Sequence, residues 1–132
     1  MYLNRLKYEE KCSFLELAKC ISEVDGNTSS EEILVIQQYI KEVGFHQNWE
    51  ILSKSLDEIL ESFNKSSFLV KKIILFEILI LVHSDNEFCE REEKVIRRLT
   101  DSFSIPQEDY DQLVDITNNL VLNLKQVNGI LF

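Results

Sequence analysis

The stretch SDNEFCERE (residues 84–92) interrupts a strongly apolar run, and a stretch of the same design, VDGNTSSEE (residues 24–32), lies 60 positions earlier. Each contains an Asp, then Gly or Asn, and a Glu seven residues after the Asp. Gly and Asn best tolerate the left-handed backbone conformation that often ends a helix. The pattern therefore predicts that this small chain makes the same turn between helices twice.

The repeat extends beyond the two turns, because residues 14–45 can be laid over residues 74–105 without a gap. The identical pairs are Leu15/Leu75, Asp25/Asp85, Glu32/Glu92, Val35/Val95 and Ile36/Ile96. In the first half, Ser29 and Glu32 have the spacing of a capping box, in which each side chain bonds to the other's backbone N–H. Cys89 replaces the serine in the second half, so we expect a weaker cap there.

The composition favours a helical domain with a substantial core. Of the 132 residues, 45% are hydrophobic, and there are only 3 Gly and 1 Pro, so few turns depend on special backbone residues. We expect an all-α fold in which residues 1–132 form one compact bundle of six or seven helices. Two repeated helix-turn-helix units would surround a buried central helix.

Apolar residues at helical spacing predict where these helices lie. We expect helices over residues 5–24, from Ser29 to Gly44, over 48–63 and over 68–84, a fifth through Val95 and Phe103, and a sixth that begins with Pro106 at its first position. The tail, residues 122–132, either docks on the bundle or frays. Inward-facing positions are predicted at Ile33, Ile36, Tyr39, Ile40 and Val43 in the second helix, Trp49, Leu52, Leu56, Ile59, Leu60 and Phe63 in the third, and Tyr110, Leu113, Ile116 and Leu120 in the sixth.

The most apolar segment, FLVKKIILFEILILV (residues 68–82), is too short and too charged to suit a membrane span. It has 15 residues and contains Lys71, Lys72 and Glu77, whereas a spanning helix needs about 20 apolar residues. We therefore expect a buried central helix and no direct insertion into a membrane.

Charge and cysteine content narrow the function classes. The net charge of −9 argues against a nucleic-acid partner, since no basic face for phosphate is evident. It suits divalent cations or a basic protein partner, and it also suits solubility alone.

Cys12 and Cys20 would lie about 12 Å apart on one helix, too far for a disulfide. The odd count of 3 Cys, with no recognisable signal peptide, predicts a reducing cytoplasm.

The acidic residues of the two turns, Asp25, Glu32, Asp85 and Glu92, are the candidate metal ligands. Carboxylates beside the free carbonyls of a helix end suit a hard cation such as Ca²⁺ or Mg²⁺. The alternative is structural, because both glutamates are already explained as capping residues and the loops lack the ligand spacing of an EF-hand. Both interpretations stay open.

The remaining polar residues show no catalytic pattern. His83 and Cys89 lack the second pair of ligands that a zinc site needs, and no nucleophile with an adjacent base is evident. A basic stripe formed by Arg91, Lys94, Arg97 and Arg98 either pairs with neighbouring acids, for instance Glu93, or docks an acidic partner.

Two segments of the repeat, AKCISEVDGNTSSEE (residues 18–32) and LILVHSDNEFCEREE (residues 79–93), resemble the paired segments of the tellurite-resistance TerB-like family. That family has a helix ending in an Asp-Gly turn and a Glu that opens the next helix, twice. FSIPQEDYDQL (residues 103–113) is similar to its later region, so the resemblance covers about residues 12–115. The chain departs from the family at Asn27, which is commonly acidic there, and at Asn86, which is usually Gly.

The resemblance implies a non-enzymatic helical interaction domain in a stress or tellurite- and metal-resistance system. It also implies a protein partner, which can belong to a membrane-associated complex, and an acidic surface that responds to divalent cations; a homo-oligomer is compatible with it. The first alternative is a co-chaperone-like or scaffold domain without a ligand. The second, a carboxylate metalloenzyme, is disfavoured because the Glu-x-x-His motif of helical metal sites is absent.

Overall fold

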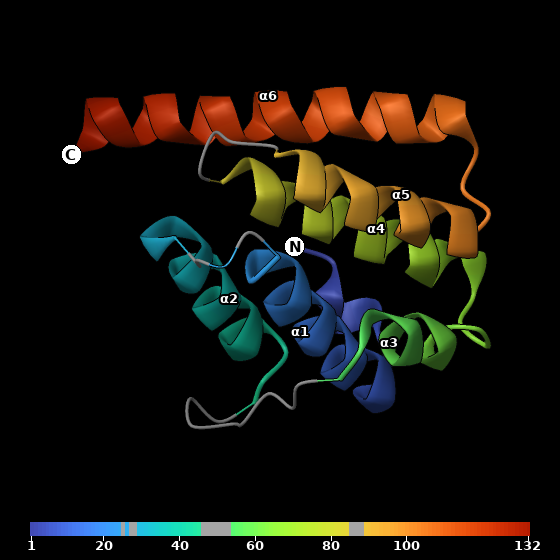
Figure 1. Cartoon of the computed structure of the whole chain (residues 1–132). Coiled ribbons are helices and arrows are strands. Elements are labelled where there is room, and N and C mark those ends of the chain that lie inside the picture. Colours follow the sequence, from blue (N-terminus) through green and yellow to red (C-terminus); the bar gives the residue numbers. More distant parts are fainter. Residues whose placement is uncertain (25, 27–28, 46–53, 85–88) are drawn as a thin grey trace.

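The computed structural model describes residues 1–24, 26, 29–45, 54–84 and 89–132, and in these residues every regular element is a helix (Figure 1). The elements are a 3₁₀ turn η1 (Leu3–Arg5) and the α-helices α1 (Tyr8–Ser22), α2 (Ser30–Glu42), α3 (Leu56–Ser62), α4 (Phe68–His83), α5 (Glu90–Ser102) and α6 (Gln107–Leu131). The predicted all-α fold is confirmed, and the pairs α1–α2 and α4–α5 are the two helix-turn-helix units.

Helix α4 is the centre of the core. It begins where the Ser67 hydroxyl accepts a hydrogen bond from the Val70 backbone N–H, at 3.1 Å. Ten of its 16 residues are buried, and it contacts α1, α2, α5 and α6. A helix that is apolar around its whole circumference needs such neighbours on all sides. The predicted buried central helix is therefore confirmed.

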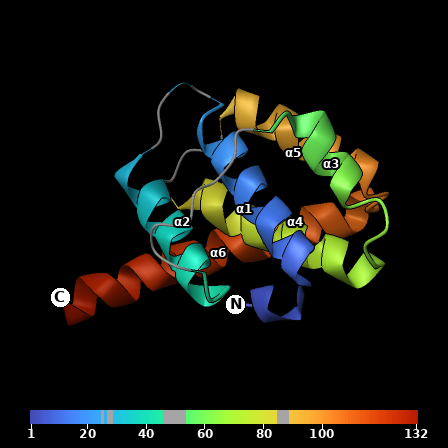
Figure 2. The same cartoon turned by 90° about the horizontal axis from the view of Figure 1, so that it is seen from below.

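The other helices lie on opposite sides of α4. In Figure 1, the long rod of α6 crosses above α4 and α5, while α1, α2 and α3 lie below; Figure 2 shows the second group from below. Edge-to-face ring contacts join the elements: Phe14 of α1 meets Tyr39 of α2 with ring centroids 4.9 Å apart, and Phe63 meets Phe103 at 5.8 Å. The first pair stabilises the packing of α1 against α2, and the second joins the end of α3 to the end of α5.

One carboxylate is buried in the middle of α4 and is fully engaged. Glu77 is 1% exposed, and its Oε1 accepts from the Met1 ammonium at 2.7 Å and from the Tyr2 backbone N–H at 2.9 Å. The ammonium also lies 2.8 Å from Glu42 of α2. The Tyr39 hydroxyl donates to the Glu77 carbonyl oxygen at 2.6 Å, and burial raises the pKa of Tyr39 well above its usual value, so this donor stays protonated. The network compensates the buried charge and joins the N-terminal segment, α2 and α4.

Several predicted boundaries were wrong. The helix expected over residues 5–24 is divided, because η1 ends at Arg5 and α1 begins only at Tyr8. The helix expected over 48–63 begins at Leu56, since the Ser55 hydroxyl accepts from the Glu58 N–H and caps it there; residues 46–53, with Trp49 and Leu52, lie outside the described residues. Pro106 precedes α6 as its cap, because its carbonyl accepts the first helical hydrogen bond, from Tyr110 at 3.0 Å.

Two of the predicted inward positions were also wrong. Ile33 is 46% exposed because its neighbour Glu32 is buried, and adjacent helical residues point about 100° apart. Ile116 is 55% exposed for the same reason, since Thr117 is 0% exposed and takes the buried position. The tail continues as helix to Leu131, and its last residues, Ile130, Leu131 and Phe132, are exposed.

The described helices include none with the length and apolar character that crossing a membrane would require. Helix α4, the most apolar of them, has 16 residues. Its apolar surface is used inside the protein instead, against four neighbouring helices.

Two leucines of α4 test the burial of this helix. Leu79 is 0% exposed and Leu69 is 51% exposed. We expect Leu79→Ala to lower the free energy of unfolding by about 2–5 kcal/mol, because it leaves a cavity, and Leu69→Ala to lower it by about 0.5 kcal/mol or less. Urea denaturation followed by far-UV circular dichroism measures both values. Equal losses would contradict the central position of α4.

Candidate functional site

The structure describes two of the four predicted metal ligands. Glu32 and Glu92 are each the third residue of a helix, α2 and α5, and are 2% and 3% exposed. Asp25 and Asp85 lie outside the described residues. In Figure 1, α1 and α4 end, and α2 and α5 begin, toward the same side of the molecule.

Both glutamates are capping residues, as the structural alternative predicts. In the first unit, the Glu32 N–H donates to the Ser29 hydroxyl at 3.1 Å, and the Ser29 N–H donates to Glu32 Oε1 at 3.1 Å. In the second, the Glu92 N–H donates to Cys89 Sγ at 3.5 Å, and the Cys89 N–H donates to Glu92 Oε1 at 3.4 Å. Both capping boxes are confirmed, and the second has the longer contacts.

No group of three or more His, Cys, Asp or Glu side chains within the described residues can hold a metal ion. The predicted set includes Asp25 and Asp85, so the cation site stays a prediction. His83 is buried at the end of α4, 8% exposed. Burial raises the pKa of the Cys89 thiol above its usual value. The three cysteines are free thiols.

The basic stripe of α5 pairs mostly with neighbouring acids. Arg97 lies 3.4 Å from Glu93, and Lys94 lies 3.8 Å from Glu90, one helical turn away in each case. Arg98 pairs with Asp57 of α3. Since three of the four stripe residues already have acidic partners, pairing accounts for this stripe better than a docking face for an acidic partner does.

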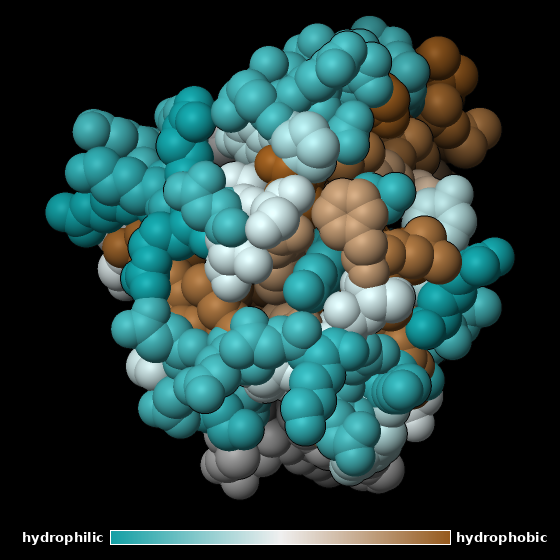
Figure 3. Space-filling view, turned by 90° about the vertical axis from the view of Figure 1, so that its right-hand side faces the viewer, coloured by the Kyte–Doolittle hydropathy of each residue, from teal (hydrophilic) through white to brown (hydrophobic). Residues whose placement is uncertain are grey.

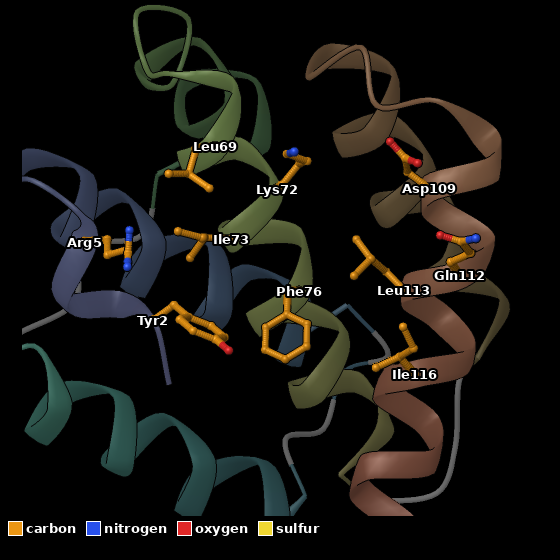
Figure 4. A pocket seen from close by; sticks show the side chains of 10 residues that line it. All are labelled: Tyr2, Arg5, Leu69, Lys72, Ile73, Phe76, Asp109, Gln112, Leu113 and Ile116. Carbon is orange, nitrogen blue, oxygen red and sulfur yellow. The ribbon is translucent and has the colours of Figure 1, made fainter.

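Two of the hollows that the described residues form lie beside α6, and the sequence predicted neither of them. The first, of about 450 Å³, lies between η1, α4 and α6 and is called the η1 hollow below. Its lining, drawn in Figure 4, consists of Tyr2, Arg5, Leu69, Lys72, Ile73, Phe76, Asp109, Gln112, Leu113 and Ile116. Figure 3, seen from the end where α4 and α6 begin, shows hydrophobic patches between hydrophilic side chains, one of them toward the upper right.

The second, of about 430 Å³, lies between α2, α4 and α6 and is called the α2–α6 groove below. The α2 wall includes Glu31, Leu34, Val35, Gln38, Tyr39 and Glu42, the α6 wall includes Val121, Leu124, Lys125 and Asn128, and Met1, Glu77, Ile80 and Ser84 complete the lining. Figures 1 and 2 show the C-terminal half of α6 passing α2 and extending beyond it.

One signal in the sequence could have identified this groove. Residues 116–132 contain a single ionisable side chain, Lys125, although 28% of all residues are charged, which would give about five in 17 positions. Leu124, Val127 and Leu131 in this stretch are 49%, 47% and 66% exposed. Exposed helix faces with little charge and much apolar surface are typical of interfaces.

Comparisons of the chain with known protein families, with curated proteins and with solved structures found no match. The resemblance to the TerB-like family therefore rests on the residues quoted for it, chiefly 18–32 and 79–93. The fold class is shown by the structure, and the family remains a prediction.

The unequal capping boxes can be tested by exchanging their caps. We expect Cys89→Ser to raise the free energy of unfolding by up to about 1 kcal/mol, because a hydroxyl is the stronger and shorter acceptor for the Glu92 N–H. The reverse change, Ser29→Cys, should lower it by a similar amount. Both are measured by urea denaturation, with Ser30→Ala outside the cap position as the control. A loss of stability in Cys89→Ser would contradict this expectation, because it would show that packing of the Cys89 thiol contributes more to stability than a stronger capping hydrogen bond does.

Proposed function

We propose that this chain is a non-enzymatic helical interaction domain that holds a partner helix in the α2–α6 groove. The exposed and weakly charged C-terminal half of α6 carries the proposal. Val121 is 6% exposed, and Leu124, one helical turn later, is 49% exposed. The apolar face of α6 is therefore continuous from the core to the groove.

The groove has the dimensions of a helix-binding site. Its α2 wall runs from Glu31 to Glu42, which is about 16 Å of helix axis and three turns of a bound helix. Leu34 and Val35 face it from α2, and Ile80 of α4 contributes to the floor. A helix with apolar residues at spacings of three and four can lay its apolar face here.

Charge favours a partner with basic residues along its edges. The lining contains three carboxylates, from Glu31, Glu42 and Glu77, against two cations, the Met1 ammonium and Lys125, so it has one net negative charge. The whole chain has a net charge of −9, which repels a second copy and attracts a basic partner. We therefore propose a basic amphipathic helix as the occupant.

The biological setting follows from the resemblance and shares its status as a proposal. We place the domain in the cytoplasm, in a stress or tellurite- and metal-resistance system, with a partner that belongs to a membrane-associated complex. In the alternative, a co-chaperone-like or scaffold domain without a ligand, the same groove would be the contact face and the acidic turns would be structural only.

Binding of designed helical peptides tests the groove. One peptide has apolar residues at spacings of three and four with lysines along its flanks, and the other has glutamates in place of the lysines. We expect isothermal titration calorimetry to detect the basic peptide only. Leu124→Asp, in the groove, should weaken binding of the basic peptide by about tenfold or more. Leu122→Asp is the matched control, because Leu122 is 43% exposed on the same helix and does not line the groove.

Three outcomes would contradict this proposal. Equal binding of the acidic and basic peptides would show that charge does not select the partner. Equal effects of the two aspartate variants would show that the peptide does not bind in the α2–α6 groove. Sedimentation velocity tests whether a second copy of the chain occupies the groove. A dimer that Leu124→Asp dissociates would show that it does, in place of a different partner.

Binding of divalent cations at the acidic turns is tested separately, by thermal unfolding with Ca²⁺ or Mg²⁺ and with EDTA. A cation that binds only the folded state raises the melting temperature in a concentration-dependent way. We expect Asp25→Ala and Asp85→Ala to reduce this rise and Glu108→Ala, a surface acid on α6, to leave it unchanged. No rise with either cation would leave the turns structural and favour the scaffold alternative.

A further inference from the structure

The η1 hollow combines an apolar lining with a local positive charge. Large side chains are exposed around it: Tyr2 by 48%, Leu69 by 51% and Ile116 by 55%. Ile73 and Leu113 extend the apolar surface inward from α4 and α6, as Figure 4 shows. The ring of Tyr2 meets that of Phe76 edge to face, with centroids 5.7 Å apart, and closes one end.

Two cations and one carboxylate line the hollow, which gives it one net positive charge in a chain of net charge −9. Arg5 and Lys72 form no ion pair with a carboxylate in the described part of the chain. The Lys72 ammonium lies 4.9 Å from the centroid of the Phe68 ring instead. A local positive charge beside low-dielectric walls concentrates anions.

The single carboxylate, Asp109, determines which side of the hollow suits an anion. Figure 4 shows Asp109 on α6 across from Lys72 on α4, while Arg5 lies on the opposite side of α4, next to Leu69 and Ile73. Repulsion by Asp109 disfavours an anion on the α6 side. The planar guanidinium of Arg5 can donate two parallel hydrogen bonds to one carboxylate.

We propose that the η1 hollow binds a small amphipathic carboxylate, with its carboxylate beside Arg5 and its apolar chain against Ile73, Leu113 and Ile116. The volume of about 450 Å³ lies in the range of small-molecule sites. A mostly apolar lining with a few polar groups is the usual design of such a site. This site is separate from the proposed partner groove, since its α6 residues end at Ile116 and those of the groove begin at Val121.

Octanoate, octylamine and 1-octanol have the same alkyl chain and different head groups, so together they test this site. All are titrated below their aggregation concentrations into the full chain, and binding is followed by chemical-shift changes in ¹⁵N- and methyl-resolved NMR spectra. We expect octanoate to bind with shifts at Ile73, Leu113 and Ile116, 1-octanol to bind more weakly, and octylamine to bind most weakly of the three.

Variants separate the contribution of charge from that of the apolar walls. Combining Arg5→Gln with Lys72→Gln should weaken octanoate by about tenfold and leave 1-octanol unchanged. The matched control is Lys65→Gln, an exposed lysine that does not line this hollow. Ile116→Asn, which removes apolar surface without adding charge, should weaken all three ligands, and circular dichroism verifies that each variant folds.

The proposal is overturned if octylamine binds as well as octanoate, or if the double glutamine variant binds octanoate as the unmodified chain does. It is also overturned if octanoate causes no shifts at the lining residues while an acidic helical peptide does, because the hollow would then take a protein segment. Persistence of octanoate binding in Ile116→Asn would place the ligand elsewhere on the surface.

Discussion

Helix α4 presents apolar side chains in every direction, so the fold must cover it on most sides, and ten of its 16 residues are buried. The consecutive residues Ile73, Ile74 and Leu75 are 7%, 0% and 0% exposed, and because successive helical residues point about 100° apart, each faces a different part of the circumference. Helices α1 and α2 cover one side, while α5 and α6 cover the other. Burial of this much apolar area is the main favourable term in the folding of the domain. The acidic exception, Glu77, is accommodated because the Met1 ammonium and the Tyr2 N–H reach it.

This arrangement also explains why both hollows lie beside α4 and α6. A helix of 25 residues is longer than its 16-residue partner, so α6 covers α4 with only part of its length. Thr117 and Val121 are buried against the bundle, whereas Leu124 is 49% exposed along the α2–α6 groove and the helix continues from there to Leu131. The spaces left on either side of this crossing are bordered by η1 in one case and by α2 in the other. The α2–α6 groove is thus a consequence of this mismatch in helix length, whereas the η1 hollow lies where the first turns of α6 run alongside α4.

Much of the fold could be predicted from the sequence because helical signals are local. Ser29 with Glu32 and Cys89 with Glu92 mark two helix starts by spacing alone, and both capping boxes are present. The errors arose where tertiary packing decides. Ile33 and Ile116 fit an apolar stripe, but Glu32 and Thr117 occupy the buried positions beside them, since each has hydrogen bonds that satisfy its polar atoms. Each hollow is lined by residues far apart in the sequence, such as Arg5 and Lys72 in the η1 hollow, and no local sequence pattern predicts that they line the same hollow.

The two turns illustrate how a repeated sequence pattern can have one structural cause. Glu32 and Glu92 are each within hydrogen-bonding distance of the N–H of a cap residue, and burial at 2% and 3% places both carboxylates inside the protein. A carboxylate that satisfies a helix N-terminus is stabilised by the helix dipole and by the hydrogen bond, so capping alone accounts for a Glu at both positions. The spacing to the preceding Asp is not explained by capping. Any argument for a cation at these turns therefore depends on Asp25 and Asp85, and the doubled glutamates add nothing to it.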